Sequence, residues 1–127
     1  GSPNIIDSNL NLSISHSRDY VAIALNAHQR IGIDIESWRD SLNSVREKFL
    51  TPQELAIYNT PNLLLQAWTA KEAIYKAAGI TGLPLHDINL PADPSSSTAT
   101  VTASNNTHIF TLHTHTTPDF TITLAYK

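Results

Sequence analysis

Residues 61–79 read PNLLLQAWTAKEAIYKAAG and predict a long helix at the centre of the chain. Pro61 suits the first helical position, where its missing N–H costs no hydrogen bond. Gly79 ends the pattern, because glycine readily adopts the left-handed conformation that closes a helix. Apolar side chains recur between them at helical spacing. The stripe consists of Leu63, Ala67, Ala70, Ile74 and Ala77.

Two shorter helices are predicted just before this one. Asp40-Ser41 supplies a cap for a segment that runs to Phe49. The tetrapeptide Thr51-Pro52-Gln53-Glu54 then combines an N-cap residue, a proline at the first helical position and a glutamate at the third. This capping box is the strongest local signal in the chain.

Strands are predicted on both sides of the helices. Residues 10–15 alternate apolar and polar side chains, as a strand with one buried face does, and apolar runs follow at 20–25 and 30–36. We expect these three to form two consecutive hairpins in an antiparallel meander. Thr-rich runs at 98–103, 107–115 and 119–126 read as further strands.

The order strands, helices, strands predicts one α+β domain over residues 3–127, with helices packed on one face of an antiparallel sheet. Gly1-Ser2 resembles the remnant of an expression tag, and the chain contains no Met. We therefore expect an excised or processed segment of a longer chain.

Composition excludes several classes of function. The formal net charge of −3 argues against general nucleic-acid binding, which needs many phosphate contacts. The apolar runs are far shorter than the roughly 20 residues of a membrane helix. The chain has no Cys, which rules out disulfides and fits a cytoplasmic location.

Two carboxylates stand side by side in the strand predicted at residues 30–36. Asp34 and Glu36 share a face with Gly32, because side chains alternate along a strand. One interpretation is that these acids merely face water. The other is that a divalent cation relieves the repulsion between them, and the glycine allows close backbone approach.

A third acid, Glu72, lies four residues before Lys76 in the long helix. Taken alone, the two form an ordinary exposed Glu–Lys pair. Taken with Asp34 and Glu36, the three acids and the lysines at 71 and 76 describe an oxygen-ligand Mg²⁺ site beside a phosphate clamp. A separate hypothesis, a histidine metal site, involves His108, His113 and His115, but a solvent-facing strand explains these residues better.

Four segments, taken in order, carry a family resemblance. They read ISHS at 14–17, IGIDIE at 31–36, FLTPQE at 49–54 and WTAKEA at 68–73. In this order they resemble the 4'-phosphopantetheinyl transferases, enzymes that move the phosphopantetheine arm of coenzyme A to a serine of a carrier protein. Because the Ser-His element precedes the others, the chain is most similar to the second lobe of the two-lobe, surfactin-synthetase-activating class.

The resemblance implies a role for each motif residue. Asp34, Glu36 and Glu72 would hold Mg²⁺ on the pyrophosphate of coenzyme A. Ser15 and His16 would contact its ribose 3'-phosphate, while Lys71 and Lys76 would contact phosphate oxygens and Lys76 would also assist catalysis. The serine proton needs a base, for which Glu72 is the first candidate. Glu54 is the second, although its capping role already explains it.

The resemblance also implies partners. The activity would be that of a holo-[acyl-carrier-protein] synthase, with coenzyme A as substrate and fatty acid biosynthesis as one pathway it could serve. An acidic apo carrier protein would dock near Arg39, Arg46 and Lys48. The alternative is a non-catalytic coenzyme A or carrier-protein binding domain. The resemblance to a second lobe also implies that an N-terminal lobe is missing, and self-association into a homo-oligomer could replace it.

Overall fold

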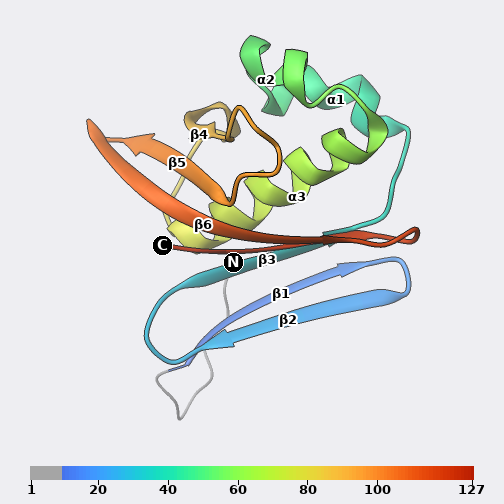
Figure 1. Ribbon diagram of the computed structural model, residues 1–127. Helices are drawn as coiled ribbons and strands as arrows, with labels where there is room; N and C mark the ends of the chain where they lie inside the picture. Colours follow the sequence, from blue (N-terminus) through green and yellow to red (C-terminus); the bar gives the residue numbers. More distant parts are fainter. Residues whose placement is uncertain (1–9) are drawn as a thin grey trace.

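The computed structural model describes residues 10–127 and has an α+β architecture (Figure 1). Gly1-Ser2, interpreted above as a tag remnant, lies outside the described residues. A five-stranded antiparallel sheet has the order β3-β7-β6-β5-β4, and β1 and β2 form a separate hairpin. The strands are β1 (Asn11–Ser17), β2 (Tyr20–Asn26), β3 (Ile31–Glu36), β4 (Ile88–Asn89), β5 (Thr98–Ala103), β6 (Asn106–Thr116) and β7 (Thr121–Tyr126).

Local sequence signals account for the helices α1 (Ser41–Phe49), α2 (Pro52–Ile57) and α3 (Pro61–Ala78). The capping box is confirmed, because Thr51 and Glu54 each bond the backbone N–H of the other. Gly79 closes α3 at φ 62°. At α1 the expected cap is wrong in detail, since the Asp40 carboxylate makes no cap bond and accepts the indole N–H of Trp38 instead.

The helices lie on one face of the sheet, as predicted. Figure 1 shows α3 crossing the sheet with α1 and α2 on the same side, and the hairpin on the other. One apolar core forms where α3 meets the sheet, and a second where α1, α2 and the start of α3 converge. A short 3₁₀ turn, Leu85–Asp87, links α3 to β4. No helix within residues 10–127 is long and apolar enough to span a membrane.

The hairpin departs from the expected meander. β2 does not continue into the sheet; β3 pairs with β7, and β1 approaches β3 through serine side chains. The Oγ atoms of Ser13, Ser15 and Ser17 accept the backbone N–H groups of β3 and the residue after it. Hydroxyl groups thus take the place that carbonyls hold in a normal ladder.

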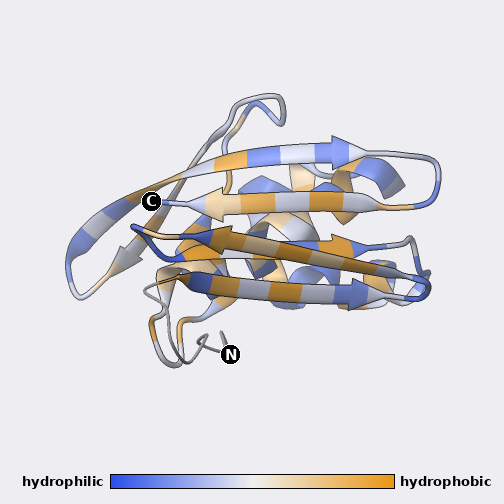
Figure 2. Ribbon diagram, turned by 90° about the horizontal axis from the view of Figure 1, so that it is seen from below, coloured by the Kyte–Doolittle hydropathy of each residue, from blue (hydrophilic) through white to orange (hydrophobic). Residues whose placement is uncertain are grey.

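The buried side of β1 is its polar one. Ser13 and Ser15 point inward, packed beside Ala22, whereas the exposed aliphatic side chains of the hairpin lie on the other face. Figure 2 shows the resulting alternation of apolar and polar residues along the hairpin strands. The close approach to β3 leaves room only for small side chains. The outer apolar face consists of Ile14, Val21, Ile23 and Leu25, with exposed fractions of 41% to 67%.

Gly32 allows α3 to lie directly against β3. A Cβ atom at this position would overlap the carbonyl oxygen of Ala73 and crowd the backbone nitrogen of Ala77. Gly32→Ala is therefore expected to lower the free energy of unfolding by about 3 kcal/mol, the upper end for overpacking, because helix backbone cannot move aside cheaply. Urea unfolding of both chains measures this, and equal stabilities would contradict the close approach.

Candidate active site

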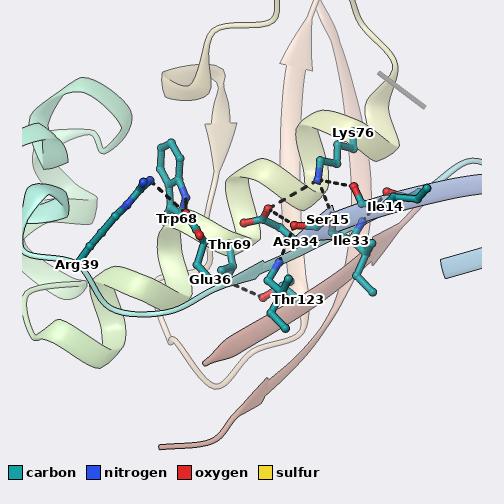
Figure 3. Close-up of polar contacts among 12 residues, drawn as sticks. Ile14, Ser15, Ile33, Asp34, Glu36, Arg39, Trp68, Thr69, Lys76 and Thr123 are labelled. Carbon is teal, nitrogen blue, oxygen red and sulfur yellow. Dashed lines mark hydrogen bonds and ion pairs between the residues drawn. The ribbon is translucent and has the colours of Figure 1, made fainter. Parts of the chain in front are cut away.

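Asp34 lies at the centre of a polar cluster between β3, β1 and α3. Its carboxylate is 7% exposed and faces α3. Oδ1 accepts the hydroxyl of Ser15 at 3.0 Å and lies 3.7 Å from Nζ of Lys76, as Figure 3 shows. Oδ2 is buried without a hydrogen-bond partner. A buried carboxylate oxygen without a partner is costly, so this atom is a candidate contact for a ligand.

Glu36 is held by two residues, Trp68 and Arg39, for which the sequence analysis predicted no contact with this acid. The indole N–H of Trp68 donates to Oε2 at 3.1 Å, and the guanidinium of Arg39 lies 3.1 Å from the same oxygen (Figure 3). Arg39 also lies 6.0 Å from the centre of the Trp68 ring. The only sequence signal for these contacts was the proximity of Trp68 to the Lys71-Glu72 motif.

Lys76 joins the hairpin to the sheet. Its Nζ donates to the carbonyl of Ile33 at 2.8 Å and to that of Ile14 at 3.3 Å, close to Asp34. Glu72 precedes it by one turn of α3 and is partly buried. Burial raises the pKa of Glu72, Lys76 lowers it, and Glu36 raises it again, so the acids influence one another electrostatically.

Burial also raises the pKa of Asp34 from 3.8 to about 7. Lys76 and the Ser15 hydrogen bond oppose this shift, whereas Glu72 and Glu36 add to it. Ionising Asp34 in the folded protein is therefore unfavourable unless a cation compensates the charge. The structure brings Asp34, Glu36 and Glu72 into one electrostatically coupled cluster.

The raised pKa predicts a pH dependence of stability. Between about 4 and about 7 the folded state holds a proton on Asp34 that the unfolded state has lost, so stability falls as pH rises. Measured in EDTA, the free energy of unfolding relative to Asp34→Asn should fall by up to about 1.4 kcal/mol per pH unit in this window. A constant difference between the two chains would show that the Asp34 pKa is not raised.

The donor set fits a hard divalent cation. Mg²⁺ prefers carboxylate oxygens and retains several waters, and Asp34 Oδ2 is such an oxygen with no protein partner. Within the described part of the chain, no three acidic or histidine side chains already form a metal cage. The ligand roles of Asp34, Glu36 and Glu72 therefore remain a proposal.

Lys71 and Glu54 lie apart from this cluster. The side chain of Lys71 is fully buried, and Nζ donates to Glu54 Oε1 at 2.7 Å and to the carbonyl of Leu85 at 2.9 Å. Glu54 Oε2 accepts the N–H of Leu90. The structure thus places the Lys71 ammonium in a core ion pair, and its phosphate contact stays a prediction. Glu54 makes the bonds that its capping role predicts, and its role as the second candidate base stays a prediction.

His16, His113 and His115 are exposed, and His108 is partly buried. His16 lies on the outer face of β1, whereas Ser15 points inward. The two side chains therefore cannot contact one phosphate from the same face of the strand. His113 bonds Tyr126, and His108 bonds Lys127. The described residues contain no histidine cluster arranged for a metal, and His115 is exposed.

Comparison with known proteins places this cluster in a family. Residues 30–125 match the model of the 4'-phosphopantetheinyl transferase superfamily. The chain is also 30% identical over 97 residues to the 4'-phosphopantetheinyl transferase HetI of Nostoc sp.. That match covers 70% of this chain and 41% of the relative, so the chain spans less than half of the relative's length. With most of the sheet, all of α3 and all three acids inside the matched region, the chain belongs to the 4'-phosphopantetheinyl transferase superfamily.

Proposed function

We propose that the chain transfers the 4'-phosphopantetheine group of coenzyme A to a serine of an acyl, peptidyl or aryl carrier protein and releases 3',5'-ADP. The observation that carries this proposal is the buried Asp34 carboxylate, whose Oδ2 has no partner and which is coupled to Glu36 and Glu72. Family membership supplies the reaction class, and the acid cluster supplies a site suited to it.

In the proposed reaction, the oxygen of the carrier serine forms a bond to the phosphorus that bears pantetheine. The bond from that phosphorus to 3',5'-ADP breaks, and the serine proton passes to Glu72. Burial raises the pKa of Glu72 in the metal-free protein, and Mg²⁺ held at the same cluster would lower it again, so the serine proton passes to Glu72 either directly or through a water molecule. Bound at Asp34, Glu36 and Glu72, Mg²⁺ would supply charge neutralisation at the pyrophosphate.

Lys76 is the cation best placed to contact phosphate oxygens. Its ammonium is partly exposed beside Asp34, whereas that of Lys71 is buried in its pair with Glu54. We assign His16, exposed at the end of the hairpin, to the 3'-phosphate of coenzyme A, as the family resemblance implies.

The carrier protein is proposed to dock beside α1. Arg46 and Lys48 lie exposed in its last turn, while Arg39 is already paired with Glu36. Replacing Arg46 and Lys48 together by Glu is expected to raise the KM for an acidic carrier about tenfold and leave kcat and coenzyme A binding unchanged. An unchanged KM in steady-state kinetics would place the docking surface elsewhere.

The function is tested by mixing the chain with an apo carrier protein, coenzyme A and Mg²⁺ and measuring the intact mass of the carrier. Phosphopantetheine addition that stops in EDTA supports the transferase. Omitting coenzyme A controls for carrier that was already modified. No addition, with coenzyme A still bound in calorimetry, would instead support a non-catalytic coenzyme A binding domain.

One observation favours the alternative function, a non-catalytic coenzyme A binding domain that lacks its partner lobe. The chain spans 41% of its transferase relative, and the outer face of the hairpin exposes Ile14, Val21, Ile23 and Leu25. A further lobe, or a second copy of the chain, would cover such a face. Sedimentation of the chain, compared with a Val21→Ser and Ile23→Ser double variant, tests self-association: a homo-oligomer made through this face becomes a monomer in the variant.

A further inference from the structure

Three serines of β1 occupy equivalent positions along the edge of β3. The Oγ of Ser13 accepts the N–H of Ile33 at 3.0 Å, and that of Ser15 accepts the N–H of Ile35 at 3.1 Å. Ser17 repeats the contact with the N–H of Ser37 at 3.2 Å. Each hydroxyl therefore uses one lone pair to hold β1 against β3, and each retains one proton to donate.

Ser15 uses that proton differently from its two neighbours. Its hydroxyl donates to Asp34 Oδ1 at 3.0 Å, and both groups are buried. In the part of the chain that the structure describes, neither Ser13 nor Ser17 donates to a carboxylate. Because the N–H of Ile35 fixes the Ser15 oxygen from behind, the direction of the donated bond is fixed as well.

The bond has a geometric consequence at Asp34. A carboxylate on a strand rotates about two side-chain bonds, and in this site only Oδ1 has partners, Ser15 and Lys76. Holding Oδ1 determines where Oδ2 points. Oδ2 is the buried oxygen without a partner, and therefore the atom available to a cation.

We propose that Ser15 is a positioning residue for the cation site, a role separate from the phosphate contact that the family resemblance implies for it. This inference rests on the proposed role of Asp34 as a Mg²⁺ ligand. Ser15 is 7% exposed, and its side chain points away from the exposed face that carries His16. It acts through Asp34, in the manner of residues that orient metal ligands from behind.

Ser13 provides a matched control. Ser13→Ala and Ser15→Ala each remove one hydroxyl that accepts a β3 N–H, so both are expected to destabilise the fold to a similar degree. Only Ser15→Ala also frees the Asp34 carboxylate. Ser15→Thr retains a hydroxyl and is expected to restore Mg²⁺ binding in part.

The experiment titrates Mg²⁺ alone, and again with coenzyme A, while thermal stability is recorded. Ser15→Ala is expected to require about 10- to 100-fold more Mg²⁺ for half-maximal stabilisation, whereas Ser13→Ala should match the wild-type chain. In the transfer assay the same shift should appear in the Mg²⁺ dependence, with little change in rate at saturating Mg²⁺.

The outcomes separate this inference from the function on which it rests. If the wild-type chain responds to Mg²⁺ and the two alanine variants respond alike, the positioning role is overturned while the transferase proposal stands. If the wild-type chain shows no response to Mg²⁺ in either titration, the metal role of Asp34 fails and the inference fails with it. If Ser15→Ala does not fold, Ser15→Cys replaces it, because a thiol still fills the site and donates only weakly.

Discussion

Glu72→Gln is expected to lower kcat for phosphopantetheine transfer by about 10²- to 10⁴-fold, the range that a general base contributes. The amide keeps the size of the side chain but can neither accept the serine proton nor bind Mg²⁺ as a charged ligand. Stability should not fall, because burial and Glu36 already disfavour the charged form of Glu72. The rate is measured by the intact mass of the carrier protein over time.

Glu47→Gln is the matched control for this variant. Glu47 is an exposed glutamate on α1, outside the acid cluster, and the same substitution there should leave kcat unchanged. A folded Glu72→Gln variant with a wild-type rate would remove Glu72 from the mechanism. Glu54 would not replace it easily, since both of its oxygens accept bonds inside the fold.

Lys71→Met is expected to lower the free energy of unfolding by about 3–5 kcal/mol, the largest effect on stability among the changes considered. It leaves the Glu54 carboxylate buried without its cation, and burial is what makes an unpaired charge costly. The pKa of Lys71 is lowered chiefly by burial, while Glu54 opposes the shift. Urea unfolding at neutral pH measures the loss.

A second substitution tests whether the unpaired charge is the cause. Combining Lys71→Met with Glu54→Gln should recover part of the stability, because no unpaired charge remains, although the amide nitrogen of Gln cannot accept one of the two backbone N–H groups that Glu54 binds. An additive loss would point to packing instead. The coenzyme A affinity of the folded variants distinguishes the two assignments of Lys71. Loss of a phosphate contact would weaken coenzyme A binding, whereas loss of a core ion pair would leave it unchanged.

The helices were predictable because their signals are local. Thr51 and Glu54 sit three residues apart in a box that needs no distant partner, and Gly79 closes α3 by its own conformational freedom. The sheet strands 98–103 and 119–126 were also found close to their observed bounds. The two-residue β4 was not, since so short a strand carries no periodicity.

The hairpin shows where sequence patterns lose information. Alternation identifies the two faces of β1 but not which one is buried, and here the polar face is the buried one. The neighbouring strand determines which face of β1 is buried, because the N–H groups of β3 donate to Ser13 and Ser15. That contact spans about 20 residues of sequence and leaves no local mark.

Strand alternation predicted that Asp34 and Glu36 share one face of β3, and in the structure the two side chains contact Lys76 and Trp68 of α3. The sequence analysis treated the two lysines of the motif as a single phosphate clamp. Lys71 and Lys76, however, are five residues apart, which turns them about 140° from each other around a helix. One therefore faces the core and the other the acid cluster, a separation that helical geometry alone implies.

The serine contacts between β1 and β3 have a consequence for how the molecule behaves in a crowded solution. β3 lies at one edge of the five-stranded sheet, and an open edge is a template on which another chain can add a strand. The serine hydroxyl groups of β1 accept the outward N–H groups of β3, so these donors are not free to pair with another strand. At the opposite edge of the sheet, β4 is only two residues long. The sheet is thus protected at both ends against growth into aggregates.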